Sequence, residues 1–243
     1  MALYQLKIAY DGTNFLGFQK QGKGRTVQAE IENGLRRLDW NGKSITAAGR
    51  TDSGVHASGQ VITFQMSWDN PLCELQKALN ANLPNDVAVM SIKEVSNDFH
   101  PRFSALSRKY VYRIYCQDQR DPLKEHYAWR VWPVVEYDKL KTAASVLVGE
   151  HDFVAFGRPP RDEDGTIRRV MMAEWNQDRN EYKFEVRANA FLYHMVRRMV
   201  FLQVRVGQGL MNLEELGSAV AGDRDIKPGI APACGLELVN VEY

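Results

Sequence analysis

The chain has 243 residues, of which 44% are hydrophobic and 25% charged, a balance that is typical of globular proteins and excludes intrinsic disorder. Its 31 Lys and Arg against 30 Asp and Glu leave a net charge of +1, which excludes a general attraction of the whole chain to nucleic acid. No segment approaches the roughly 18 uncharged apolar residues that a membrane span needs, so we expect a soluble chain with no membrane partner.

The first half of the chain predicts the order strand, helix, strand, strand, helix, strand. Its clearest element is a helix at residues 26–38, where apolar residues recur at helical spacing behind Thr26, a typical N-cap. The apolar residues of this helix are Val27, Ile31, Leu35 and Leu38. The predicted elements span residues 4–10, 26–38, 45–50, 60–66, 72–83 and 87–95. This order matches a split βαβ, ferredoxin-like unit.

The second half resembles a looser copy of the same unit. Its predicted elements are a strand at 108–115, a helix at 138–148, strands near 168–175 and 181–187, helices from about Ala190 and from Asn212, and a strand at 235–243. Residues 157–166 predict a loop, because they combine Pro, Gly and mixed charge. We predict an α+β fold of two ferredoxin-like halves, residues 1–103 and 104–243. The halves would share a mixed, mainly antiparallel sheet with helices on one side and a binding cleft on the other.

Basic residues gather in three windows that contain no Asp or Glu. The windows are residues 12–29, 99–117 and 186–213, and each also carries aromatic side chains. Arginine interleaved with aromatic residues suits phosphate contact and base stacking, so the cleft would bind RNA if the windows meet there. The candidates for contacts with the RNA backbone are Lys20, Lys23, Arg25, Arg198 and Arg205. The alternative is that the windows are three solvated faces.

The segment GRTDSGVHASG at residues 49–59 is the most unusual stretch of the chain. Its small residues allow a backbone or a ligand to approach closely. Arg50 and Asp52 lie two positions apart, which puts both side chains on one face of an extended segment. A guanidinium there would keep the carboxylate ionised and orient it, so Asp52 is a candidate nucleophile or base. The alternative is a surface ion pair beside an Asx turn.

Other chemistries find little support in the residue spacing. Glycoside hydrolysis of the usual kind needs two carboxylates, and no second acid lies near Asp52 in the sequence. The histidines show no HExxH or Cys/His spacing, and no GxxxxGK[ST] or GxGxxG loop occurs, so we expect no metal and no cofactor. Three widely spaced cysteines, Cys73, Cys116 and Cys234, form no CxxC site and suit a reducing cytoplasm.

Two further segments carry candidate ligand contacts. Alternation along residues 107–115 places Tyr110 and Tyr112 on one face, where one can belong to the core and the other can be a stacking platform or a proton carrier. The helix from about Ala190 has one apolar side and an opposite side without acids. This opposite side carries His194, Arg197, Arg198, Phe201 and Arg205. It is either a stripe that binds a polyanion or an ordinary solvated basic face.

Taken together, these residues resemble the tRNA pseudouridine synthase A family, which acts on the anticodon stem-loop. The motifs that carry the resemblance lie in family order: YDGTNFLGFQ at 10–19, GRTDSGVHA at 49–57, KYVYRI at 109–114, FLYHMVRRMV at 191–200 and APACGLELVNVEY at 231–243. They span nearly the whole chain. Two positions depart from the family pattern, since Ser53 stands where Ala is more frequent and Phe201 stands where Gly often follows the MVRRMV block.

The resemblance implies an isomerase that breaks the N1–C1′ bond of uridine at positions 38 to 40 of tRNA, turns the uracil and rejoins it through C5. By motif position, Asp52 would be the essential carboxylate, as a nucleophile on C1′ or a base at C2′. Tyr110 would stack on the uracil and could take the C5 proton. Arg197 would pair with Asp52, and Arg50 would contact phosphate or support the turn. The family needs no cofactor or metal and acts as a homodimer, with tRNA crossing both subunits.

Two other functions remain open on the sequence. A non-catalytic RNA-binding module would share the same surface without turnover. A pseudouridine synthase of altered specificity would act on another RNA. The intact Asp52 motif favours the enzyme over the binding module.

Overall fold

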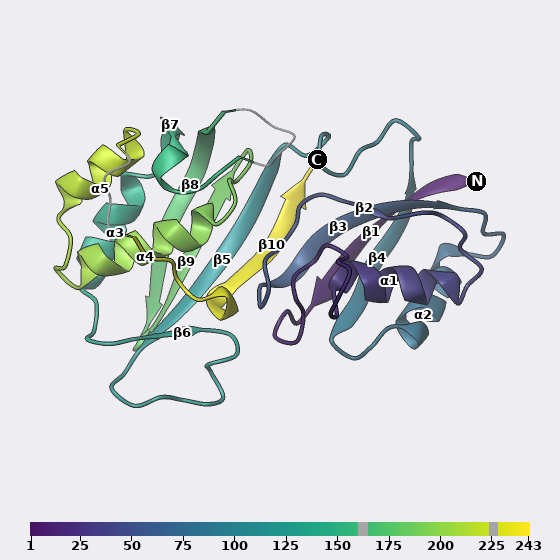
Figure 1. The fold of residues 1–243 in the computed structure, drawn as a ribbon, viewed down its shortest axis with the longest axis horizontal. Helices are drawn as coiled ribbons and strands as arrows, with labels where there is room; N and C mark the ends of the chain where they lie inside the picture. The colour runs from purple at the N-terminus through teal and green to yellow at the C-terminus, as the bar shows by residue number, and fades with distance from the viewer. Residues whose placement is uncertain (160–164, 224–227) are drawn as a thin grey trace. The chain divides into compact units, whose positions relative to one another are not determined.

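The chain folds into two compact units of strands and helices (Figure 1). The structure, a computed structural model, describes residues 1–159, 165–223 and 228–243. The first unit comprises Met1–Leu106 and Glu237–Tyr243, and the second unit comprises Ser107–Leu236. Each unit buries its own layer of apolar side chains.

The first unit contains strands in the order β4–β1–β3–β10, with the short β2 beside β3. Its elements are β1 (Ala2–Tyr10), α1 (Val27–Arg36), β2 (Thr46–Ala47), β3 (His56–Met66), α2 (Leu72–Asn82), β4 (Val87–Val95) and β10 (Leu236–Glu242). The central β1 pairs antiparallel with both β3 and β4, whereas β10 adds to β3 in parallel. The predicted order of strands and helices up to residue 95 is confirmed.

The end of the chain returns to the first unit. The sequence predicts halves at residues 1–103 and 104–243, but residues 237–243 lie with the first unit. They do so because Glu237 and Leu238 pair with the start of β3. A pairing between strands so distant along the chain leaves no trace in local periodicity.

Helix α1 shows how the predicted apolar face builds the core of the first unit. The Thr26 side chain caps the helix N-terminus, as predicted. Val27, Ile31 and Leu35 are fully buried, which stabilises the fold by about 1.5–3 kcal/mol for each side chain. Leu38 is half-buried because the helix ends at Arg36, before the predicted last turn.

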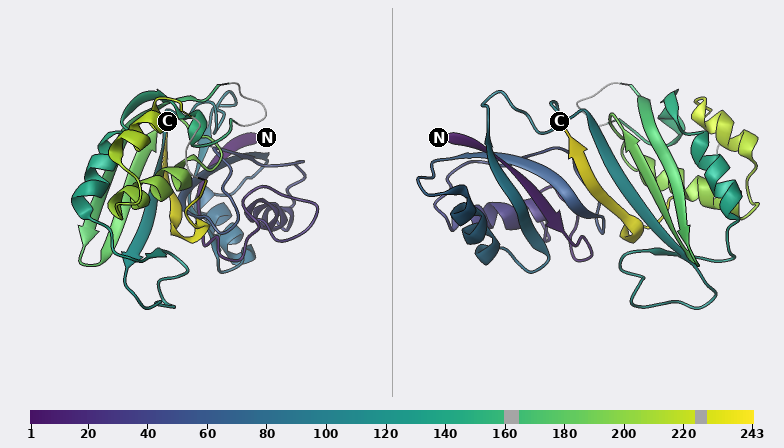
Figure 2. Two further views of the ribbon diagram at one scale, coloured as in Figure 1. Left: turned by 60° about the vertical axis from the view of Figure 1, so that its left-hand side comes forward. Right: turned by 180° about the vertical axis from the view of Figure 1, so that it is seen from behind.

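The second unit contains antiparallel strands in the order β5–β9–β8–β7, with β6 parallel to β5. Its elements are β5 (Ser107–Cys116), β6 (Trp129–Val131), α3 (Tyr137–Ser145), β7 (Gly149–Asp152), β8 (Ile167–Asp178), β9 (Glu181–Ala188), α4 (Met195–Gly207) and α5 (Leu213–Val220), with short 3₁₀ turns at Phe153–Ala155 and Ala233–Gly235. Helices α3 and α4 pack on each other, α3 on β8 and α4 on β5. Figure 2 shows these helices on one face of the unit's strands.

One predicted strand is much shorter in the structure, and two strands of the structure were not predicted. The strand at 45–50 is reduced to the two residues of β2, and β6 and β7 are strands that the sequence did not predict. Part of the predicted loop at 157–166 lies outside the described residues. Strands as short as β2 and β6 carry too few residues to show alternation.

Helix α4 begins five residues later than the predicted start near Ala190. His194 adopts a left-handed conformation with φ 68°, which interrupts the helical path directly before Met195. Tyr193 pairs with Arg158 in an isolated bridge, with Tyr193 N donating to Arg158 O at 2.9 Å. The residues before α4 therefore form an extended loop although their apolar spacing continues that of the helix.

The predicted α+β class is confirmed, with mixed strand pairing and helices in both units. In the described part of the chain, no helix combines the length and the hydropathy that a membrane span requires. The RNA-binding cleft, expected on the side of the sheet opposite the helices, stays a prediction.

Candidate active site

Asp52 lies in the tight loop between β2 and β3. Gly54, at φ 76°, turns the chain just after it, and the Asp52 carbonyl accepts a hydrogen bond from Val55 N at 3.2 Å. The Asp52 side chain is half-buried. Its backbone is therefore fixed by a closed turn, which suits a carboxylate that must be held in one position.

Segment 10–18 at the end of β1 holds the residue before Asp52. Tyr10 Oη lies 2.8 Å from Thr51 Oγ1, and Phe18 N donates to Thr51 O at 3.0 Å. Thr51 is buried between these contacts. The residue that precedes the carboxylate is thus fixed through both its side chain and its backbone.

The same segment holds the residues after Asp52. Ser53 Oγ and Gly54 N both donate to Phe15 O, at 3.0 and 3.4 Å. Phe15 is itself buried in the core of the first unit. The motifs YDGTNFLGFQ and GRTDSGVHA therefore form one local structure around Asp52, although neither predicts the other in sequence.

The side chain of Arg50 is exposed. Among the residues that the structure describes, no hydrogen bond or ion pair involves it, so the predicted pair with Asp52 is not formed. The prediction assumed the alternation of an extended strand, but β2 already ends at Ala47. The Arg50 guanidinium is therefore open to solvent.

Tyr110 and Tyr112 occupy different environments on β5. Tyr112 is fully buried, and its hydroxyl donates to Pro232 O at 2.7 Å. Burial holds the pKa of Tyr112 well above its ordinary value. Tyr110 is half-buried, and its ring meets Phe191 edge-on with centroids 5.1 Å apart. Of the predicted pair, Tyr112 therefore belongs to the core and Tyr110 is the more accessible phenol.

Arg197 lies in the first turns of α4 and is half-buried. Its Nε donates to Ala231 O at 2.8 Å, and Ala231 N donates back to Arg197 O at 3.2 Å. The hydrogen bond from Nε orients the plane of the guanidinium, and the backbone hydrogen bond holds the two segments together. Asp52 belongs to the first unit and Arg197 and Tyr110 to the second, so their mutual approach stays a prediction.

The basic face of α4 is partly covered by residues near Ala231. Arg198 Nη1 donates to Gly229 O at 2.6 Å, and burial lowers the pKa of Arg198. A Cβ at Gly229 would lie 2.0 Å from the ring of Phe201, so Phe201 packs flush against this backbone. Arg205 Nη2 donates to Leu210 O at 3.1 Å. Arg198 and Arg205 therefore donate to the protein's own backbone. The basic side of α4, expected either to bind a polyanion or to be an ordinary solvated face, is half-buried.

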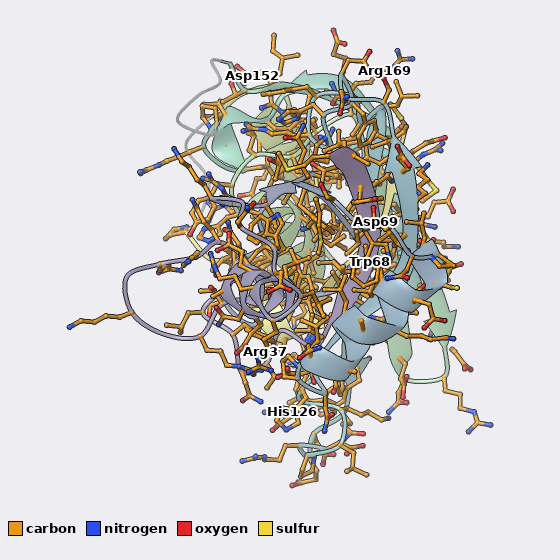
Figure 3. All side chains as sticks on the ribbon, turned by 90° about the vertical axis from the view of Figure 1, so that its right-hand side faces the viewer. Arg37, Trp68, Asp69, His126, Asp152 and Arg169 are labelled. Carbon is orange, nitrogen blue, oxygen red and sulfur yellow. The ribbon has the colours of Figure 1, made fainter. Side chains whose placement is uncertain are left out.

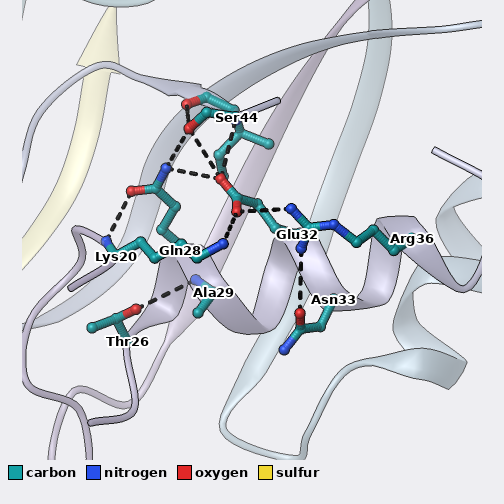
Figure 4. Close-up of polar contacts among 9 residues, drawn as sticks. Lys20, Thr26, Gln28, Ala29, Glu32, Asn33, Arg36 and Ser44 are labelled. Atoms are coloured by element: carbon teal, nitrogen blue, oxygen red, sulfur yellow. Dashed lines mark hydrogen bonds and ion pairs between the residues drawn. The ribbon is translucent and has the colours of Figure 1, made fainter. Parts of the chain in front are cut away.

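Two of the three candidate cations of the first basic window, Lys20 and Arg25, pair with acids from outside it. Lys20 forms an ion pair with the buried Glu32 at 3.0 Å, within the polar network of Figure 4. Arg25 binds both carboxylate oxygens of Asp86, at 2.6 and 2.8 Å. It also pairs with Glu30 at 2.6 Å. The window contains no acid along the chain, yet folding brings three to it.

Lys23, the remaining candidate of this window, has an exposed side chain. Within the described residues, no hydrogen bond or ion pair of Lys23 is found.

In the described part of the chain, no group of three or more His, Cys, Asp or Glu is arranged to hold a metal ion.

Phe191 is the site residue that sequence reasoning left without a role. Its contact with Tyr110 depends on the extended loop before α4. A signal was present, because Phe191 opens the FLYHMVRRMV motif that also contains Arg197. Tyr110 contacts the first residue of this motif, and Arg197 belongs to the motif.

Comparison with known proteins reveals one family. The profile of the tRNA pseudouridine synthase family matches residues 7–104 and 143–243. The tRNA pseudouridine synthase A of Limosilactobacillus fermentum is 36% identical over 249 residues, which cover 100% of this chain and 96% of that protein. The protein of the same name from Geobacter sp. is 37% identical over 241 residues, 98% of each chain.

Similarity to solved structures is weaker. A chain of the Cbf5–Nop10–Gar1 complex aligns with a TM-score of 0.38 and 15% identity, covering 84% of this chain and 44% of that one. The sequence matches are closer than these structural ones, and they include both the Asp52 loop and the FLYHMVRRMV segment. The chain therefore belongs to the tRNA pseudouridine synthase family and is an isomerase.

Proposed function

We propose that the chain converts uridine to pseudouridine in the anticodon stem-loop of tRNA, at positions 38 to 40, without a cofactor. The observation that carries this proposal is the Asp52 loop, which segment 10–18 grips on both sides of the carboxylate. Family membership supplies the reaction class. A loop this firmly held is what a single catalytic carboxylate requires.

Asp52 acts on the ribose of the target uridine. As a nucleophile its carboxylate attacks C1′ while the N1–C1′ bond breaks, and as a base it removes the C2′ proton to leave a glycal. In either case uracil is released, turns and bonds to C1′ through C5. This breaks the Asp52–C1′ ester bond in the first case and returns the proton from Asp52 to C2′ in the second. The C5 proton then leaves and N1 ends with a proton, so the overall reaction is an isomerisation.

Tyr110 stacks on the freed uracil and accepts the C5 proton. Its ring is braced at the edge by Phe191, which leaves the phenol oriented by packing on β5. Arg197 pairs with the Asp52 carboxylate and helps to orient it. Its anchoring on Ala231 O supports this role because it presents the guanidinium in a fixed plane.

The enzyme contacts the phosphates of the tRNA and extrudes the target base from the stem. Extrusion from a stem costs a few kcal/mol, which basic and aromatic contacts offset. Arg50 and Lys23 are exposed and, unlike Lys20, form no ion pair within the described residues, so they are the proposed phosphate contacts. We further propose that the enzyme is cytoplasmic and acts as a homodimer. Light scattering at micromolar concentration measures the molar mass and so tests the dimer.

Release of tritium from [5-³H]uridine-labelled tRNA tests the proposed function. The native chain should release tritium, and Asp52→Asn should release none while its tRNA affinity changes by less than about tenfold. Asp69→Asn is the matched control, because Asp69 is an exposed carboxylate of the same unit (Figure 3). A native chain that binds tRNA and releases no tritium would be the non-catalytic binding module. Release only from another RNA would indicate altered specificity.

A further inference from the structure

His56 lies directly behind the Asp52 loop, at the first position of β3, and is only 7% exposed. The chemistry proposed above does not use it. Its Nδ1 lies 3.0 Å from Gly12 N and 3.1 Å from Asp11 Oδ1. One ring nitrogen cannot accept a hydrogen bond from an amide and donate one to a carboxylate at the same time, so these two contacts exclude each other.

The backbone of Gly12 decides between them. An amide N–H can only donate, so the contact with Gly12 requires a lone pair on Nδ1 and places the ring proton on Nε2. Asp11 Oδ1 has other donors, since Thr13 N and Thr13 Oγ1 donate to it at 3.0 and 2.6 Å. His56 in its neutral form is therefore an acceptor for Gly12.

Gly12 is pressed against the far end of the Asp52 loop. A Cβ at residue 12 would lie 2.1 Å from Val55 O, so the two backbones meet with no room for a side chain. The carbonyl of Gly12 accepts a hydrogen bond from Phe15 N at 3.0 Å, and Phe15 O in turn accepts Ser53 Oγ at 3.0 Å. The position of Gly12 is thus transmitted to Ser53 and Val55, on the C-terminal side of Asp52.

We propose that His56 is a positioning residue for Asp52. Its Nδ1 accepts the Gly12 N–H and so holds segment 10–18 against the loop that presents the carboxylate. Without this acceptor the buried amide is left unpaired, and segment 10–18 leaves its place to reach another partner. The effect on turnover rests on the proposed function of Asp52, but the hydrogen bond itself does not.

Two substitutions of His56 distinguish the Nδ1 acceptor from mere ring packing. His56→Asn places a side-chain oxygen as many bonds from Cα as Nδ1, whereas His56→Gln reaches the position of Nε2. A displacement of about 1 Å in a reacting group can lower a rate about 10²-fold. We expect His56→Gln to lower the single-turnover rate of tritium release about 10²-fold at unchanged tRNA affinity, and His56→Asn to retain the rate within about tenfold.

Amide hydrogen exchange reports on the same hydrogen bond and does not depend on catalytic activity. His56→Gln should speed exchange in peptides that cover residues 10–18 and 49–57, and His56→Asn should not. His126→Gln, at an exposed histidine labelled in Figure 3, is the matched control for both measurements. Thermal unfolding of each variant establishes that it is folded.

The outcomes separate this inference from the proposed function. Equal rates and equal exchange in His56→Gln and the native chain would overturn the positioning role, and so would equal losses in both His56 variants. A native chain that releases no tritium from any tRNA would overturn the proposed function alone. In that case the exchange pattern still decides whether the Nδ1 of His56 holds the loop.

Discussion

Tyr110 is a phenol that can stack, transfer a proton or do both. If it only stacks, Tyr110→Phe keeps the ring and most of the activity. If the hydroxyl takes the C5 proton, the variant binds tRNA normally and turns over about 10² to 10⁴-fold more slowly, which is our expectation. Single-turnover tritium release measures this rate. A rate near that of the native enzyme would leave stacking as the role of the ring.

Arg197 tests whether orientation or charge matters beside Asp52. A lysine keeps the positive charge. It lacks the planar guanidinium, which can donate to Ala231 O from Nε and to a carboxylate from its two other nitrogens. We expect Arg197→Lys to lower the single-turnover rate by more than about tenfold with little change in tRNA affinity. Arg37→Lys is the control, since Arg37 is exposed at the C-cap of α1. Unchanged rates in Arg197→Lys would place this side chain outside the active site.

Helix α1 is tied to the neighbouring loops through Glu32, a buried carboxylate. Lys20 and Arg36 both pair with it, at 3.0 and 3.3 Å, and Ser44 Oγ donates to it at 3.0 Å (Figure 4). Glu32→Gln removes the charge that these donors share, so we expect the free energy of unfolding to fall by about 2 kcal/mol. Denaturant titration measures the loss. Glu74→Gln, at an exposed glutamate, should change stability by less than about 0.5 kcal/mol.

The same carboxylate makes stability depend on pH. Burial alone would raise the pKa of Glu32, but hydrogen bonds from Lys20, Gln28 and Ser44 outweigh it and hold the pKa below its ordinary value. The unfolded chain therefore binds the proton more readily than the folded chain does. The stabilisation is complete above the pKa of an ordinary glutamate and is lost as pH falls through the lowered folded value. The difference in stability between the native chain and Glu32→Gln should shrink over that range.

At the scale of the whole molecule, tRNA affinity depends on which cations the fold leaves accessible. The net charge of +1 predicts no general attraction, but local phosphate contacts release counterions regardless of net charge. We expect affinity to fall steeply with salt, and Lys23→Gln to make the slope of log affinity against log salt shallower by about 1. Lys43→Gln, at an exposed lysine outside the windows, is the control. Affinity almost independent of salt would assign the windows to solvated faces.

The sequence alone determined most of the helices and strands and the family. Strand β4 matches its predicted range 87–95, and Thr26 caps α1 as predicted, because alternation and capping depend on residues that are neighbours along the chain. The motifs around Asp52 and Arg197 likewise determined the family, since each is a contiguous run of residues. The predicted contact between Arg50 and Asp52 was wrong because it extended strand geometry past the end of β2.

Only the tertiary structure decided which side chains are available. Arg25 lies in a window without acids, yet Asp86 and Glu30 neutralise it, and Arg198 is half-buried on the backbone of Gly229. Tyr110 and Tyr112 are indistinguishable by alternation, but one is accessible and the other is fully buried. Burial and ion pairing depend on residues that folding brings together from distant parts of the chain, and the periodicity of a single segment carries no record of those partners.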